Sequence, residues 1–137
     1  MQSTAHTKCE TSKIDLYSVT ETLAQGGQAK VVRAQNAKGK ILAIKVWPHH
    51  TKKGGSELAT PDSIRVECEL YKKLKHRSVI KTYEHKSSGK WTKGIHSSSV
   101  AYLVMELMQC DMAFLIKLKP FPEPICRHFF GQMIDVI

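Results

Sequence analysis

The run from Ile41 to Trp47 places a single lysine, Lys45, inside a segment that is otherwise apolar. In an extended strand, alternate side chains point to opposite faces, and here both faces consist of apolar residues. Such a strand is expected to be buried on both sides. A buried ammonium group without an anionic partner costs several kcal/mol, so Lys45 requires a carboxylate from elsewhere in the chain.

Glu67 has the complementary requirement in a predicted helix over residues 63–75. Residues 60–62, Thr-Pro-Asp, have the N-cap, first-turn proline and early acid that are typical of a helix start. The helical neighbours on the side of Glu67 are apolar: Ile64, Leu70, Tyr71 and Leu74. We predict that Lys45 and Glu67 form an ion pair. From these residues alone, a purely structural salt bridge and a functional pair fit the pattern equally well.

The remaining pattern predicts an α+β fold. Five segments have the alternation or apolar content of strands: 17–23, 29–35, 41–47, 79–84 and 100–107. Two short helices are expected over 112–118 and 125–137, after the one large helix. Polar composition predicts a flexible tail over residues 1–13 and a long surface loop over 86–99. We therefore expect an antiparallel sheet of about five strands with one large helix.

The composition excludes several classes of protein. The chain is 42% hydrophobic and 24% charged, as in ordinary globular domains. It has no run of about 18 apolar residues and no signal-peptide order, and Gln2 excludes N-terminal myristoylation. The cysteines lack a C-x-x-C pair, and the histidines lack metal-ligand spacing. We expect reduced thiols, no metal site and an intracellular, cytoplasmic protein without membrane segments.

The net charge of +9 is spread over many segments and predicts solvated faces rather than a nucleic-acid site. One segment is an exception, because residues 86–93 place Trp91 between lysines. A weaker hypothesis is therefore that this segment docks an acidic partner or a phosphate backbone.

The order of the parts gives the chain a family resemblance. A glycine-containing hairpin over residues 23–34 precedes Leu42-Ala43-Ile44-Lys45, and Glu67 follows in a helix. Residues 75–80 and 102–108 continue the same order. From about Tyr17 to Ile137 the chain resembles the catalytic domain of eukaryotic-type Ser/Thr protein kinases. The resemblance implies a small lobe over residues 14–107, with the hinge and an incomplete helical second lobe over residues 108–137.

The resemblance also implies an ATP site whose phosphate end contains Gly26, Gly27, Lys45 and Glu67. Gly26 corresponds to the central glycine of the phosphate-covering loop, and Gly27 stands beside it. Lys45 corresponds to the lysine that contacts the α- and β-phosphates, and Glu67 to the carboxylate that holds this lysine in place. Glu69 is the rival for the second role, but it points away from the apolar helix face.

Two alanines depart from the family pattern in the same loop. Ala24 and Ala29 stand where the first and third glycines usually lie. A methyl group at either position makes the loop less pliant.

At the adenine end of the site, the resemblance implies apolar contacts from Leu23, Val31 and Ala43. Met105 corresponds to the gatekeeper. The remaining expected contacts are the main chain of Glu106 and Met108 in the hinge and a ribose-binding polar residue, Asp111.

The sequence contains no His-Arg-Asp catalytic loop and no Asp-Phe-Gly magnesium motif. We therefore assign no catalytic residue and no metal ligand; Mg²⁺ is implied by the family alone. The hypothesis is a truncated kinase domain that binds ATP and does not itself transfer phosphate to a protein substrate. The alternative is a non-catalytic, pseudokinase-like interaction fragment. Because residues 125–137 are apolar on all sides, self-association through this helix is expected.

Overall fold

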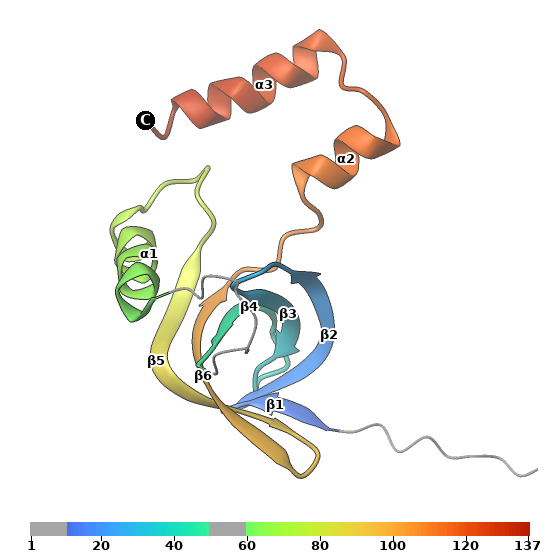
Figure 1. The fold of residues 1–137 in the computed structure, drawn as a ribbon. Coiled ribbons are helices and arrows are strands. Elements are labelled where there is room, and N and C mark those ends of the chain that lie inside the picture. The colour runs from blue at the N-terminus through green and yellow to red at the C-terminus, as the bar shows by residue number, and fades with distance from the viewer. Residues whose placement is uncertain (1–10, 50–59) are drawn as a thin grey trace, which may run out of the picture.

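The computed structural model describes residues 11–49 and 60–137. Within these residues, four strands come before one long helix, and two strands and two further helices come after it (Figure 1). The strands are β1 (Ser12–Ile14), β2 (Tyr17–Gln25), β3 (Lys30–Gln35), β4 (Ile41–Pro48), β5 (Thr82–Lys93) and β6 (His96–Met105). The helices are α1 (Pro61–Lys73), α2 (Met112–Leu118) and α3 (Glu123–Ile134).

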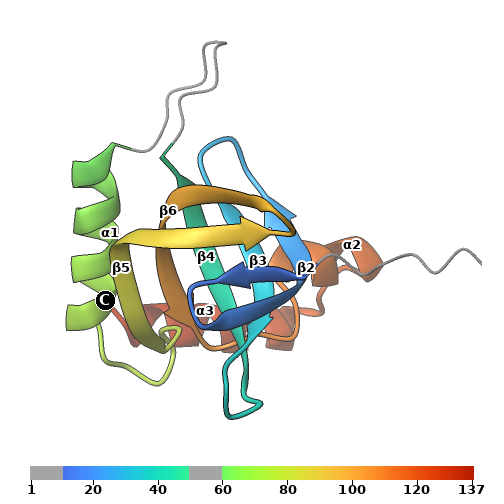
Figure 2. The same ribbon diagram turned by 90° about the horizontal axis from the view of Figure 1, so that it is seen from below.

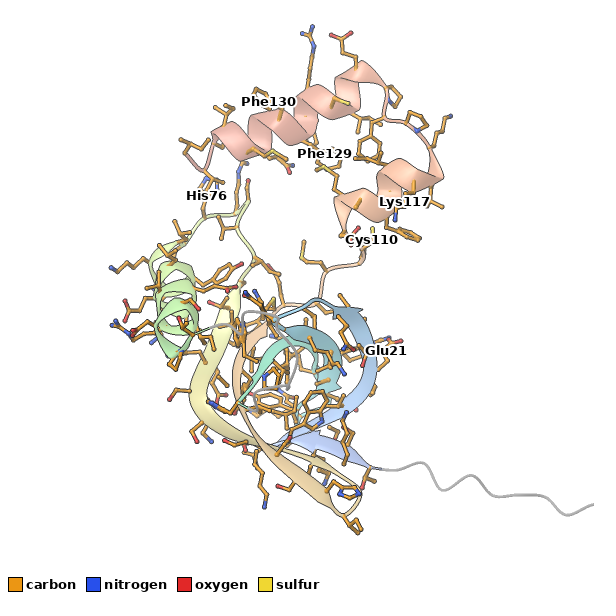
Figure 3. The ribbon with its side chains drawn as sticks, in the orientation of Figure 1. Glu21, His76, Cys110, Lys117, Phe129 and Phe130 are labelled. Carbon is orange, nitrogen blue, oxygen red and sulfur yellow. The ribbon has the colours of Figure 1, made fainter. Side chains whose placement is uncertain are left out.

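The strands form a closed antiparallel barrel in the order β1-β2-β3-β4-β6-β5. The short strand β1 closes it, because β1 pairs with β2 on one side and with β5 on the other (Figure 2). Helix α1 lies outside the barrel beside β5, and α2 and α3 lie beyond one end of it (Figures 1 and 3). The predicted fold class is confirmed, with β1 as an additional sixth strand.

Two local predictions are wrong. Residues 86–99, predicted as a surface loop, form most of a long hairpin in which Lys93 pairs with His96 at the tip. Most of the serines and lysines that suggested a loop are exposed to solvent, while the backbone ladder continues beneath them apart from an irregularity between Lys86 and Gly89. The predicted tail over residues 1–13 is also wrong at its end, because Ser12 and Lys13 belong to β1. Residues 1–10 lie outside the described part of the chain.

Strand β4 is buried on both faces, as the sequence predicts. Its Leu42, Ile44 and Val46 point into the barrel, where they pack with apolar residues of the other strands. Its Ala43 and Trp47 point the other way, into a second cluster that lies beneath α1. The helix begins at Thr60, whose hydroxyl accepts a hydrogen bond from the Ser63 N–H, so the predicted N-cap is confirmed.

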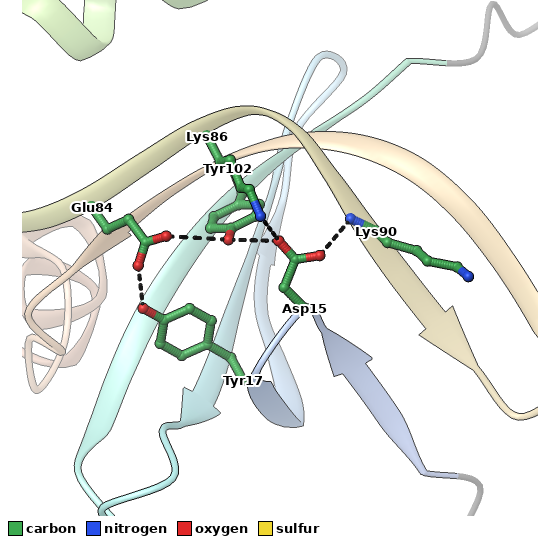
Figure 4. Close-up of polar contacts among 6 residues, drawn as sticks. All are labelled: Asp15, Tyr17, Glu84, Lys86, Lys90 and Tyr102. Atoms are coloured by element: carbon green, nitrogen blue, oxygen red, sulfur yellow. Dashed lines mark hydrogen bonds and ion pairs between the residues drawn. The ribbon is translucent and has the colours of Figure 1, made fainter.

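A polar network fastens β1 to the long hairpin (Figure 4). Asp15, in the turn between β1 and β2, has a positive φ of 47°. Its carboxylate accepts hydrogen bonds from Lys86 Nζ at 2.7 Å, from the Lys90 N–H at 2.9 Å and from the Tyr102 hydroxyl at 2.9 Å. Burial acts to raise the pKa of Asp15, but these hydrogen bonds outweigh it and hold the pKa below its ordinary value.

The two tyrosines of this network also contact Glu84. The Tyr17 hydroxyl donates to Glu84 Oε2 at 2.7 Å. The Tyr102 hydroxyl has one hydrogen and donates it to Asp15 at 2.9 Å, so its contact with Glu84 Oε1 at 3.5 Å is a longer, secondary one. Burial, together with the adjacent carboxylate of Glu84, raises the pKa of Tyr17 to about 12. Both phenols therefore stay protonated and act as donors, and they connect β2, β5 and β6.

Gly89 allows Tyr102 to reach this network, since a Cβ at Gly89 would lie 2.4 Å from Tyr102 Cε1. We predict that Gly89→Ala lowers the free energy of unfolding by about 2 kcal/mol in urea denaturation, because the tyrosine ring must shift in a packed barrel. Gly131→Ala in α3 is the control, since a Cβ there meets nothing within 4 Å. Equal effects of the two substitutions would contradict the prediction.

Candidate functional site

The candidate site is centred on Lys45 of β4 and Glu67 of α1. Lys45 Nζ lies 2.5 Å from Glu67 Oε1, so the two side chains predicted to pair form an ion pair. Their side chains are 28% and 31% exposed, which leaves the pair accessible from one side. The helix is held against the sheet by Cys68, which is buried in the cluster that contains Ala43 and Trp47.

Glu69 has a different environment from Glu67. Its carboxylate lies 3.4 Å from Arg65 Nη1 one turn earlier on α1, and both side chains are exposed. The rival of Glu67 therefore faces solvent. Between them, Cys68 is a free, buried thiol, and burial raises its pKa.

Trp47 is a contact of Lys45 that the sequence analysis did not single out. Its ring centroid lies 5.0 Å from Lys45 Nζ, within the range of a cation–π interaction. The sequence signal for this contact was the spacing of Lys45 and Trp47, because residues two apart on a strand point to the same face. Trp47 and Glu67 together restrict the position of the Lys45 ammonium group.

The turn between β2 and β3 contains Gly26 and Gly27. The Gly26 N–H donates to the Ala29 carbonyl at 2.9 Å, which closes the turn. A Cβ would meet only the Ala29 oxygen, at 3.6 Å, from Gly26 and nothing within 4 Å from Gly27. Neither glycine has a positive φ. The described fold therefore does not itself require glycine at these positions, and the turn backbone stays open to close approach.

The apolar residues expected at the site are distributed over four strands. Val31 pairs with Lys45, and Ala43 pairs with Met105 across the sheet. Val31, Ala43 and Met105 contribute to the same cluster, on the sheet face that Lys45 shares. Leu23 lies near the end of β2 and is 45% exposed. The strand register thus places an apolar surface next to the ion pair.

The residues that follow β6 already have structural roles. The Glu106 N–H donates to the Lys81 carbonyl at 2.9 Å, and Glu106 Oε1 accepts from the Lys81 N–H at 2.7 Å. Met108 is exposed. Asp111 is the N-cap of α2, with Oδ1 accepting from the Phe114 N–H at 2.6 Å. The sequence analysis missed both the Glu106 and the Asp111 contacts.

Comparison with known proteins agrees with this arrangement. The family model described as the protein kinase domain matches residues 17–137. The chain therefore belongs to the protein kinase domain family.

Individual relatives are protein kinases of several kinds. CBL-interacting protein kinase 30 of Oryza sativa subsp. japonica is 29% identical over 124 residues, which are 88% of this chain and 24% of the relative. Serine/threonine-protein kinase PLK4 of Xenopus laevis is 28% identical over 122 residues, which are 86% of this chain and 12% of the relative. Testis-specific serine/threonine-protein kinase 3 of Mus musculus is 29% identical over 124 residues, which are 88% of this chain and 42% of the relative. The chain thus spans less than half the length of each.

None of the helices in the described ranges combines the length and the apolar content that a membrane span requires.

We predict that the Lys45–Glu67 pair has a measurable coupling energy. A double-mutant cycle with Lys45→Met and Glu67→Gln, followed by urea denaturation, should give about 1 kcal/mol, because both side chains are more than half buried. The exposed Arg65–Glu69 pair is the control and should give about 0.3 kcal/mol. The same coupling in both pairs would show that the partial burial of Lys45 and Glu67 adds nothing.

Proposed function

We propose that this chain is the ATP-binding portion of a Ser/Thr protein kinase. The observation that carries the proposal is the Lys45–Glu67 ion pair, which adjoins the apolar surface of Val31, Ala43 and Met105. A cation next to an apolar surface suits a ligand with an anionic end and a flat apolar end, which describes a nucleoside triphosphate. Protein kinases use ATP and Mg²⁺ in general.

Each residue at the phosphate end has a distinct role in this proposal. Lys45 provides the positive charge for the α- and β-phosphates, and Glu67 and Trp47 hold its ammonium group in position. The backbone of Gly26 and Gly27 covers the phosphates, since no side chain blocks its approach. The ion pair with Glu67 also orients the Lys45 side chain before the nucleotide binds. Less conformational entropy of this side chain is then lost on binding.

At the other end of the ligand, Leu23, Val31 and Ala43 enclose the adenine ring, and Met105 limits the depth of the pocket. The main chain of Glu106 and Met108 bonds the adenine edge. Asp111 contacts the ribose through the carboxylate oxygen that does not cap α2.

Magnesium is assigned no ligand in this proposal. Within residues 11–49 and 60–137, no three His, Cys, Asp or Glu side chains lie together as a metal site. When bound with ATP, the ion neutralises phosphate charge.

Phosphate transfer to a protein hydroxyl is proposed for a complete catalytic domain that contains these residues. The 137 residues contain no His-Arg-Asp and no Asp-Phe-Gly motif, so we propose that they do not transfer phosphate themselves. Transfer of the γ-phosphate to a basic peptide, abolished by Lys45→Met, would overturn this part of the proposal.

Nucleotide binding is tested by titration with the non-hydrolysable analogue AMP-PNP, with and without Mg²⁺. Binding should raise the free energy of unfolding by about 2.7 kcal/mol at a hundredfold excess over Kd. Lys45→Met should weaken the affinity about tenfold or more, because a charge-assisted contact to phosphate is lost. Lys38→Met removes the same charge in the turn before β4 and should leave the affinity unchanged. No stabilisation of the parent chain would refute the proposal.

The second candidate function is a non-catalytic interaction fragment that associates through α3. The observation that favours it is the exposure of large apolar side chains there: Ile125, Phe130, Met133 and Ile134. Phe130, on α3 in Figure 3, is 64% exposed. Exposed large apolar side chains that are concentrated on one helix favour association.

Self-association is measured by light scattering over a range of protein concentrations. We predict that the parent chain forms dimers or larger species, and that Phe130→Lys together with Met133→Lys shifts the average mass towards the monomer. Leu16→Lys is the control, because Leu16 is 85% exposed in the turn after β1, away from α3. A parent chain that is monomeric at every concentration would exclude this candidate.

A further inference from the structure

A cavity lies at the end of the barrel, between the β2–β3 turn and the tip of the β5–β6 hairpin. Its volume is about 360 Å³. The turn residues 25–29 line one side, and the hairpin lines the other. The polar and aromatic side chains around it are Gln25, Gln28, Lys30, Trp91, Lys93, His96, Ser97 and Ser98.

This cavity is separate from the face that carries the Lys45–Glu67 pair. Val46 lines the cavity and belongs to the cluster inside the barrel. Lys45 is the next residue along β4, so its side chain points to the opposite face of the strand. The sheet itself therefore lies between the two sites, and they share only the β2–β3 turn.

The cavity presents hydrogen-bond donors and positive charge. Lys93 is exposed, and its Nζ lies 4.2 Å from the Trp91 ring centroid. Trp91 is fixed in turn, because its Nε1–H donates to Ser12 Oγ of β1 at 2.9 Å. His96, Ser97 and Ser98 add an imidazole and two hydroxyls on the adjacent strand. None of the described residues that line the cavity is Asp or Glu.

We propose that this cavity binds a phosphate monoester. A dianion with three acceptor oxygens matches a wall that offers an ammonium group, an imidazole and two hydroxyls. The volume is at the lower end of the range for small-ligand pockets, so it suits one phosphorylated side chain or one small phosphate ester. The partly exposed ring of Trp91 provides an apolar surface for the carbon atoms that carry the phosphate.

A nucleic acid fits the cavity less well. Single-stranded binding sites combine a basic groove with successive aromatic side chains, whereas Trp91 is the one aromatic residue among those that line this cavity in the described ranges. The β2–β3 turn and the hairpin also bound the cavity on two sides, so it accommodates a single group more readily than a continuous backbone.

The test is calorimetric titration of the Lys45→Met chain, in which the other candidate phosphate-binding lysine is removed. The probes are the end-blocked tripeptide Gly-phosphoserine-Gly, its unphosphorylated form, the analogue Gly-Glu-Gly and inorganic phosphate. We expect saturable binding of the phosphorylated peptide that weakens as salt increases, and no binding of the unphosphorylated one. If the phosphopeptide binds more tightly than inorganic phosphate, the ligand is a phosphorylated side chain. If the two bind equally, the ligand is a free phosphate. Both results support a phosphate site in this cavity.

The matched variants are Lys93→Gln and Lys90→Gln. Both remove one positive charge from β5, but Lys93 lines the cavity and Lys90 does not. Lys93→Gln should weaken binding about tenfold, because a charge-assisted hydrogen bond is lost, and Lys90→Gln should weaken it less than twofold. Unfolding curves check that both variants fold.

Three results would overturn the proposal: no saturable binding of either phosphate probe up to about 10 mM, equal losses in the two lysine variants, or equal binding of Gly-Glu-Gly. A parallel titration with single-stranded DNA that bound more tightly than the phosphopeptide, and lost affinity on Lys93→Gln, would also overturn it in favour of a nucleic-acid site. The result does not depend on nucleotide binding at Lys45, so the two proposals can fail separately.

Discussion

The burial of β4 on both faces is the constraint on which the rest of the structure depends. One face closes the interior of the barrel, and the other requires a helix to cover it. Lys45 interrupts this second face, so the covering helix must also supply an anion. Glu67 meets the requirement and Glu69 cannot, because Glu69 lies on the solvent side of α1 with Arg65. The position of α1 is therefore determined jointly by apolar burial and by one charge.

Closure of the barrel depends on a second, independent set of contacts. The three residues of β1, Ser12–Ile14, pair with β2 on one side and with β5 on the other. The Asp15 carboxylate accepts hydrogen bonds from both strands of the long hairpin. Gly89 leaves the space that the Tyr102 ring occupies beneath this carboxylate. A family resemblance based on the nucleotide-site residues carries no information about these contacts, which join the β1–β2 turn to β5 and β6 (Figure 4).

The sequence predicted the parts of the fold in which local pattern and burial agree. The start of α1 at Thr60, the hairpin of β2 and β3 and the two-sided burial of β4 all follow from spacing and residue type. The hairpin over residues 86–99 could not be predicted in this way, because its stability comes from cross-strand pairing with a partially solvated face. β1 has only three residues, too few for any periodic signal, and its stability comes from tertiary pairing.

The same division applies to the candidate site. Lys45 and Glu67 were recognisable because each conflicts with its own apolar surroundings, and a conflict of this kind is visible in sequence. Trp47, the contact of Glu106 with Lys81, and the capping role of Asp111 create no such conflict. Strand spacing places Trp47 on the same face as Lys45 but does not mark it as a contact of the ammonium group. The other two contacts depend on three-dimensional neighbours alone.

A closed barrel also determines how this domain can meet another protein. Within residues 11–49 and 60–137 every strand has a neighbour on each side, but β1 is so short that it pairs with only Tyr17–Val19 of β2 and Trp91–Lys93 of β5. A partner that adds a strand of its own, which is a common way for short peptides to bind, could pair only with the parts of these two edges that β1 leaves uncovered. Elsewhere, recognition of the barrel must use side chains and turns, and its specificity then depends on residue identity rather than on a generic backbone template.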